Sequence, residues 1–266
     1  MEFYRSIRRL GAALPLACFL AAPCAAGGTG AYAGELLSRT GQVLSAPARV
    51  RPADAPWLAG AAAGGLLLYS ADGGIRRAFL RSRSGLNDTL SDILERFGDG
   101  GVALGITGAY WGVSSLLGEK REARTAALCV QSFAAANAAG TLVKAAAGRS
   151  RPYADRGKGV FRPFELKTSY TSFPSGHTTT AFSLASVVAY RHESGWVKAA
   201  AYGLASGTAL QRIYADKHWA SDVFAAALLG TATGRWIASM DAAGRSASLL
   251  PFVPGGGPGL SAAVPF

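Results

Sequence analysis

The chain has 266 residues, of which half are hydrophobic and only 16% are charged, and its formal net charge at pH 7 is +11. Because about a quarter of the residues of an average protein are charged, this composition favours closely packed helices, which could lie in a membrane. The positive charge could serve a nucleic acid, an acidic membrane surface or an anionic substrate, but aromatic residues for stacking on bases are sparse among the clustered cations, which argues against a nucleic acid.

The first 33 residues have the pattern of an export signal. A positive segment with Arg5, Arg8 and Arg9 precedes an apolar run over residues 10–22, and small residues follow it. This order predicts a signal peptide that is cleaved near residue 26 or residue 33. The alternative is an uncleaved membrane anchor, although the run is short for a span of about 20 residues.

The cysteines agree with export. Cys18 and Cys24 lie in the predicted leader, so a chain cut after Ala26 keeps Cys129 alone. Such a chain forms no internal disulfide, and its stability would come from packing.

Six Ala-rich segments show the apolar spacing of α-helices. They run approximately over residues 57–71, 100–118, 122–148, 175–191, 196–213 and 218–240. Between the first two, a segment that begins at Asn87 or Asp88 as N-cap carries Leu90, Ile93, Leu94 and Phe97 on one face, which predicts a short amphipathic helix on the bundle or on a membrane surface.

We therefore predict an all-α fold, with a six-helix core bundle over residues 57–240 and the short amphipathic helix between the first two core helices. Residues 34–56 would form an N-terminal extension of this bundle. Residues 241–266 are rich in Gly and Pro near their end and read as a flexible tail.

Glycines recur at a spacing of four in most of the helical segments. The pairs are Gly60/Gly64, Gly101/Gly105, Gly108/Gly112, Gly203/Gly207 and Gly230/Gly234, with Gly140/Gly148 at twice that spacing. Small residues on one face let helix backbones approach closely, as membrane helices often require. A tight soluble bundle gains from the same geometry, so the pairs leave both possibilities open.

Lys144 and Arg151 form the first group of candidate site residues. They are seven residues apart, about two helical turns along one face, and Pro152 disfavours helix at the residue before it. Both cations should therefore emerge at one end of the bundle. They belong to an excess of seven basic residues over two acidic ones between Lys144 and Lys167, which we interpret as a local anion site.

The stretch SFPSGH, residues 172–177, predicts a helix N-terminus. Pro174 suits a first helical turn, Ser175 can cap or donate, and Gly176 lets the backbone come close to a ligand. Free N–H groups and the helix dipole favour an anion at such a terminus. His177 would then be held beside that anion.

His218 and Asp222 form the third group, together with Arg212. A separation of four lets the carboxylate reach one imidazole nitrogen on a helix and fix the tautomer, which leaves the other nitrogen free as a nucleophile. Singly, each group is a common surface pattern. Together they use two of the chain's three histidines, at helix ends that an alternating bundle brings to the same side.

In this order the three groups resemble the type 2 phosphatidic acid phosphatase superfamily, which includes bacterial acid phosphatases, lipid phosphate phosphatases and vanadium haloperoxidases. The matching residues are Lys144 to Arg151-Pro152, then Pro174-Ser175-Gly176-His177, then Gln211-Arg212 to His218 and Asp222. One position departs from the family pattern, because Gln211 stands where the family usually has Ser. Its amide can still donate a hydrogen bond, so we expect altered surroundings and not an inactive enzyme.

The resemblance implies a phosphatase that needs no metal and no other cofactor. Neutral His218, aligned by Asp222, would attack phosphorus and form a phosphohistidine, while His177 protonates the departing alkoxide. The phosphate oxygens would be bound by Lys144, Arg151, Arg212 and the N–H groups of Ser175 and Gly176. Two histidines with a single Asp make no convincing metal site.

The resemblance leaves the substrate and the location open. Phosphomonoesters, phospholipids and polyprenyl diphosphates are all candidate substrates, and aromatic residues of the loop (Tyr153, Phe161, Phe164, Tyr170) could either shape a pocket for an apolar leaving group or pack within the loop. An exported chain could be a soluble periplasmic bundle or a membrane-embedded one. The alternative functions are a vanadium-dependent haloperoxidase and a non-catalytic, anion-binding membrane bundle.

Overall fold

The computed structural model describes residues 29–243, which form eight α-helices and four short 3-10 turns. The α-helices are α2 (Thr29–Leu44), α3 (Ala55–Arg81), α4 (Gly85–Gly98), α5 (Gly100–Leu116), α6 (Lys120–Ala147), α7 (Gly176–Arg191), α8 (Gly195–Tyr214) and α9 (Ala220–Ala243). The 3-10 turns are Ala46–Arg49, Pro52–Asp54, Pro152–Ala154 and Thr168–Tyr170. Within these residues there is no strand, only an isolated antiparallel bridge between Arg149 and Phe161. The all-α prediction is confirmed, whereas most of the predicted leader and most of the tail lie outside the described residues.

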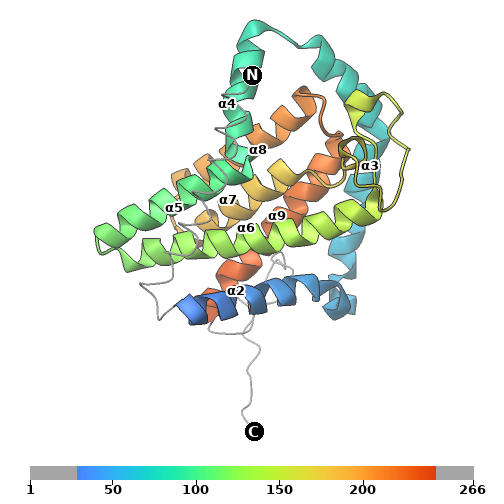
Figure 1. Ribbon diagram of the computed structural model, residues 1–266. Helices are drawn as coiled ribbons and strands as arrows, with labels where there is room; N and C mark the ends of the chain where they lie inside the picture. Colours follow the sequence, from blue (N-terminus) through green and yellow to red (C-terminus); the bar gives the residue numbers. More distant parts are fainter. Residues whose placement is uncertain (1–28, 244–266) are drawn as a thin grey trace.

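Helix α7 lies at the centre of the bundle and packs against α6, α8 and α9 (Figure 1). Its closest neighbour is α9, because two glycines of α9 leave no room between the backbones. A Cβ atom on Gly230 would lie 2.6 Å from the carbonyl oxygen of Thr179, and one on Gly234 would lie 2.3 Å from that of Ser183. This predicted glycine pair therefore sets the distance between the two helices.

Helix α3 extends ten residues beyond the end of the predicted segment 57–71, because it continues through Asp72 to Arg81. Asp72 is buried and pairs with Arg149, whose guanidinium Nη2 lies 2.8 Å from Oδ2 of Asp72. The buried carboxylate of Asp72 therefore does not end the helix, because the guanidinium of Arg149 pairs with its charge.

Helix α4 is the predicted amphipathic helix, with two differences from the prediction. Its N-cap is Ser84, whose hydroxyl accepts a hydrogen bond from the N–H of Asn87, and not Asn87 or Asp88. Its apolar residues also divide between two faces, because Leu94 packs against Gly207 of α8 whereas Leu90 and Ile93 are exposed. The helix lies against α7 and α8 and presents a second apolar face outward.

Helix α2 occupies part of the segments predicted as leader and N-terminal extension. It packs along α6 (Figure 1), and Arg124 of α6 binds both Glu35 of α2 (Nη1–Oε2 3.0 Å) and Asp241 of α9 (Nε–Oδ1 2.9 Å). The hydroxyl of Tyr32, which is buried, donates to the carbonyl oxygen of Ala127. The sequence pattern gave no indication of this helix, because it is anchored mainly by polar contacts.

Candidate active site

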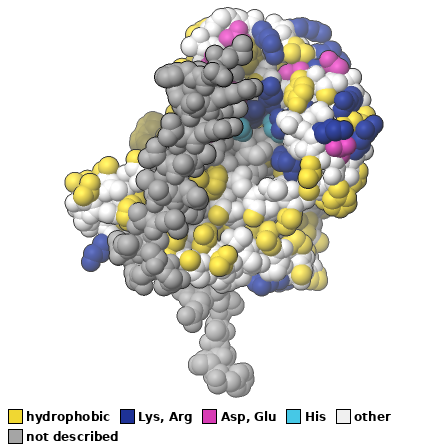
Figure 2. Space-filling view, viewed as in Figure 1, with side chains coloured by type: hydrophobic (Ala, Val, Ile, Leu, Met, Phe, Trp, Pro, Cys, Tyr) yellow, Lys and Arg dark blue, Asp and Glu magenta, His cyan; other side chains and the backbone are white. Residues whose placement is uncertain are grey.

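The three groups of candidate residues meet at one end of the bundle. The end of α6, the start of α7 and the segment between α8 and α9 converge there, and the loop of residues 148–175 covers them. Figure 2 shows histidine side chains at the bottom of a recess bordered by Lys and Arg side chains. The structure therefore brings together residues that lie up to 78 positions apart, from Lys144 to Asp222.

His218 is buried and held in one tautomer. Its Nδ1 lies 2.6 Å from the carbonyl oxygen of Ser172, which can only accept, so Nδ1 carries the proton. Nε2 has no hydrogen-bond partner among residues 29–243 and keeps its lone pair. Burial and then the positive charges of Arg151, Lys144 and Arg212 hold the pKa of His218 well below its ordinary value, so the ring is neutral at neutral pH.

Asp222 does not align His218 by a direct hydrogen bond, contrary to the prediction from their spacing. Its Oδ2 lies 3.9 Å from Nδ1 of His218 and instead accepts from the hydroxyl of Ser172 (2.5 Å) and the N–H of Trp219 (2.9 Å). Because Ser172 offers its carbonyl oxygen to His218, the carboxylate acts on the imidazole through Ser172.

Arg149 lies at the site but was not predicted as a site residue. In the sequence it was only one of the seven clustered basic residues. Its side chain is fully buried, and its two terminal nitrogens bind Asp72 and Asp222. It also lies over the ring of Trp219. The signal that could have found it is a single acidic residue, Asp72, in an otherwise apolar helical segment, since such a charge requires a buried partner.

Lys144 and Arg151 both contact the loop that precedes α7. Nζ of Lys144 donates to the carbonyl oxygens of Thr171 (3.0 Å) and Pro174 (2.5 Å), and Nη2 of Arg151 lies 3.2 Å from the hydroxyl of Thr171. The Nε–H of Arg151 is buried and has no partner in the described part of the chain. An unsatisfied charged donor of this kind is suited to an anion.

Arg212 is held from the side by helix α4. Its Nη1 lies 2.9 Å from Oε1 of Glu95 and 3.2 Å from Oε1 of Gln211, and the Gln211 amide in turn donates to the hydroxyl of Ser91 on α4 (3.1 Å). The Nε–H of Arg212 is buried and, like that of Arg151, unpaired within residues 29–243. Gln211 therefore links Arg212 to α4, which agrees with the expectation of altered surroundings at this position.

His177 lies in the first turn of α7 and touches the end of α4. A Cβ atom on Gly98 would lie 2.7 Å from Cβ of His177 and 2.6 Å from Cγ2 of Thr208, so only glycine fits there. Burial and the charge of Arg212 lower the pKa of His177 to about 4, while Glu95 opposes this shift. His177 is thus neutral at neutral pH unless a negative charge binds beside it.

The N-terminus of α7 offers fewer free donors than predicted. The N–H of Ser175 donates to the carbonyl oxygen of Asp222 (3.3 Å), because the first turns of α7 and α9 lie against each other. Its hydroxyl accepts from Thr178. The N–H of Gly176 has no partner among the described residues, so Gly176 and not the backbone of Ser175 remains available to an anion.

Three other cations of the basic loop lie over aromatic rings. Arg156 and Arg162 lie over the ring of Tyr170, which is buried, and Lys158 lies over Tyr69. Phe164 is largely exposed. Of the seven clustered cations, Lys144 and Arg151 contact the segment that precedes α7, and Tyr170 is a packing residue. Within residues 29–243, no three His, Cys, Asp or Glu side chains gather as a metal site.

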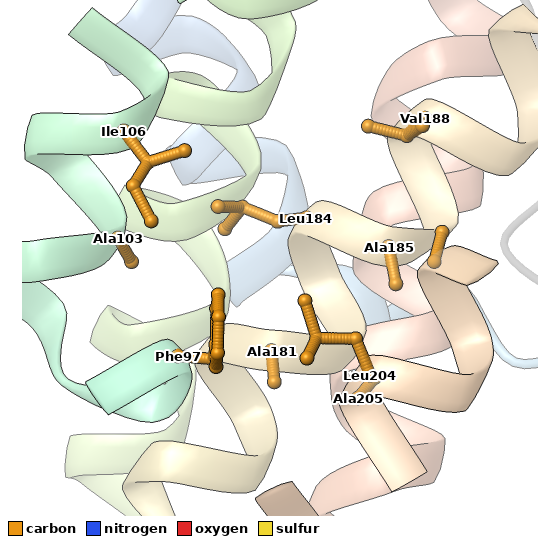
Figure 3. Close-up of a pocket in the computed structure, with 10 residues that line it drawn as sticks. Phe97, Ala103, Ile106, Ala181, Leu184, Ala185, Val188, Leu204 and Ala205 are labelled. Atoms are coloured by element: carbon orange, nitrogen blue, oxygen red, sulfur yellow. The ribbon is translucent and has the colours of Figure 1, made fainter. Parts of the chain in front are cut away.

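An apolar cleft of about 210 Å³ runs along α7 (Figure 3). Its walls come from the end of α4 and from α5, α7 and α8. The lining residues are Phe97, Ala103, Ile106, Ala181, Leu184, Ala185, Val188, Ala201, Leu204 and Ala205. Figure 3 shows Ala103 and Ile106 on one side of this space and the residues of α7 and α8 on the other.

Comparisons with known proteins agree with this geometry. Over 78 residues the chain is 41% identical to a lipid A 1-phosphatase of Porphyromonas gingivalis, a match that covers 27% of this chain and 18% of that protein. Over 124 residues it is 32% identical to a lipid A 1-phosphatase of Rhizobium johnstonii, which covers 44% of this chain and 47% of that protein. The chain thus spans less than half the length of these two relatives.

The fold is similar to that of a transmembrane phosphatidylglycerolphosphate phosphatase of the PAP2 type from Bacillus subtilis. The TM-score is 0.56 at 21% sequence identity, over 70% of this chain and 96% of that structure. The PAP2 superfamily model matches residues 125–245, a segment that contains all eight predicted site residues. Residues 125–245 thus match the PAP2 superfamily, the type 2 phosphatidic acid phosphatases, and the predicted site residues within them gather around one recess.

Proposed function

We propose that the chain is a phosphatase that removes a phosphate group from a lipid through a phosphohistidine intermediate. The observation that carries this proposal is the environment of His218. Nδ1 is fixed on the carbonyl oxygen of Ser172, Nε2 keeps a free lone pair, and three cations surround the ring. A neutral imidazole among cations is suited to attack a phosphate that those cations bind.

In the first step the Nε2 lone pair of His218 attacks phosphorus, and the bond between phosphorus and the leaving oxygen breaks on the opposite side. The Nε–H groups of Arg151 and Arg212 and the N–H of Gly176 donate to the phosphate oxygens. His177 gives its proton to the leaving oxygen. The negative charge of the bound phosphate raises the pKa of His177 from about 4, so this proton is taken up with the substrate.

In the second step water breaks the phosphorus–nitrogen bond. Neutral His177 accepts a proton from that water while its oxygen attacks phosphorus. Phosphate leaves, and His218 recovers its lone pair. Because the cations around the recess would repel a divalent ion, the residues of the site support both steps without a metal.

Two kinds of observation favour a lipid substrate and a membrane-embedded protein. The relatives named above act on lipid A or phosphatidylglycerolphosphate by their descriptions. Helices α6 and α9 are long and apolar enough to cross a membrane, and large apolar side chains are exposed on several helices, such as Leu66, Leu67, Leu116, Leu142 and Leu228. A surface with so many exposed apolar residues requires a cover, which a bilayer supplies.

The test is a trapping experiment with a phosphate ester labelled with ³²P. We expect the purified chain, in detergent and in the presence of a chelator, to retain label on His218 after rapid quenching in alkali. The His218→Ala variant should lose the label and at least about 10³-fold in kcat, by analogy with the loss of other catalytic nucleophiles.

His192 provides the matched control, because it is the third histidine and lies at the other end of the bundle, 3.1 Å from Glu122. The His192→Ala variant should keep the label and the rate. Full activity of His218→Ala on every phosphoester tested would exclude the proposed mechanism.

A further inference from the structure

We infer that the apolar cleft along α7 binds one hydrocarbon chain of the substrate, so that the length of this chain determines which phosphates the enzyme selects. The inference rests on the proposed function and extends it by naming the surface that holds the lipid chain.

The cleft lies on the same face of α7 as His177. Ala181, Ala185 and Val188 follow His177 at four, eight and eleven residues, and these spacings return to one side of an α-helix. From His177 to Val188 the helix rises by about 16 Å, at about 1.5 Å per residue. A chain that lies in the cleft would thus run along the helix that carries the proposed general acid.

Phe97 connects the cleft with the catalytic recess. It lines the cleft at the end of α4, and the next residue, Gly98, approaches His177 so closely that a Cβ atom would not fit. The head of a molecule in the cleft would therefore reach His177 beside Phe97. This continuity favours the substrate's own chain over an unrelated bilayer lipid as the occupant.

The chemistry and the shape of the cleft fit a hydrocarbon chain. All ten lining residues are Ala, Val, Leu, Ile or Phe, so the cleft offers a polar ligand no hydrogen-bond partner from a side chain. Ile106 of α5 and Leu204 of α8 are both partly exposed at its sides. The cleft is thus open laterally, and a lipid could enter it between α5 and α8 without leaving the bilayer.

The experiment compares soluble n-alkyl phosphates of increasing length with phenyl phosphate, below the concentrations at which they aggregate. For the wild type we expect kcat/KM to rise about fourfold with each added methylene, the effect of burying one such group, until the cleft is full, and then to level off. The readout is the ratio of kcat/KM for octyl phosphate to kcat/KM for phenyl phosphate.

Two variants reduce the space in the cleft. Ala185→Leu fills its middle, and Ala201→Leu fills it from a partly exposed position on α8, where a larger side chain disturbs the fold less. Each should lower the ratio at least tenfold. Ala199→Leu is the matched control, because Ala199 is an exposed residue of α8 outside the cleft, and it should keep the wild-type ratio.

Three outcomes would overturn the inference: a ratio that is unchanged in both cleft variants, a ratio that falls equally in Ala199→Leu, or a wild-type rate that does not depend on chain length. Failure of the proposed function gives a different result, since no phosphate ester, phenyl phosphate included, would then be hydrolysed by the wild type. The two failures are therefore distinguishable.

Discussion

Two arginines at the site, Arg149 and Arg212, are held by carboxylates from helices that carry none of the motif residues. Arg149 pairs with Asp72 of α3, and Arg212 pairs with Glu95 of α4. A cation that binds a transient phosphate needs a partner that keeps its direction between turnovers. For Arg212 this partner also acts on His177, the proposed general acid, because Glu95 interacts electrostatically with its ring.

We expect the Glu95→Gln variant to shift the pH dependence of kcat/KM. The negative charge of Glu95 raises the pKa of His177, so its removal lowers that pKa further. In the proposed mechanism His177 must be protonated to release the leaving group, and the alkaline limb of the profile should therefore move to lower pH. Loss of the ion pair with Arg212 should also lower kcat/KM about tenfold, as about 1.4 kcal/mol of binding to the transition state would.

Asp92→Asn is the control for this prediction, because it removes a negative charge from an exposed position of the same helix. Its profile should superimpose on that of the wild type. An equal shift in both variants would indicate a general effect of net charge and would contradict a specific role for Glu95.

Helix α9 approaches α7 through Gly230 and Gly234, and only some of the other predicted glycine pairs have a comparable role. Gly64 touches Phe224 and Gly207 touches Leu94, whereas a Cβ atom on Gly60, Gly105, Gly112 or Gly203 would meet nothing within 4 Å. Two glycines four residues apart therefore indicate close approach of a neighbouring helix in α9, but not in α5, where Gly105 and Gly112 meet no atom within 4 Å. The difference depends on which face of each helix has a neighbour.

The Gly234→Ala variant should be destabilised, by about 1–3 kcal/mol as for other overpacked core positions, because its Cβ atom would lie 2.3 Å from the carbonyl oxygen of Ser183. Gly203→Ala adds the same atom to open space and should instead stabilise α8 by about 0.5–1 kcal/mol. Thermal unfolding of both variants in the same detergent measures the difference. Equal midpoints would contradict close packing of α7 on α9.

The sequence was sufficient to predict the helices with apolar periodicity and the gathering of the motif residues at one end of the bundle. It was insufficient where two distant polar groups meet. The positions of α5 to α9 follow from local pattern, and the motif residues from their spacing. The continuation of α3 beyond residue 71 depends on Arg149, and α2 is anchored by Arg124. The role of Ser172 between Asp222 and His218 depends on the loop conformation, which no local pattern encodes.

At the scale of the whole molecule, the exposed apolar surface and the two helices that could cross a membrane lead to one prediction. After expression with its leader, the chain should remain with the membranes when these are washed with alkaline carbonate, and detergent should be needed to release it. Immunoblots of pellet and supernatant are the measurement. Release into the carbonate supernatant would favour the soluble bundle that the sequence left open.

The anchoring of α2 has a consequence for where the predicted leader could be cleaved. A leader peptidase that cuts after Ala26 would leave α2 whole, whereas a cut after Ala33 would remove the first turn of α2 together with Tyr32 and its hydrogen bond to Ala127. Glu35, which binds Arg124, would then lie next to a new positive N-terminus that competes for its carboxylate. Of the two predicted cleavage positions, the earlier one is therefore the one compatible with an intact bundle.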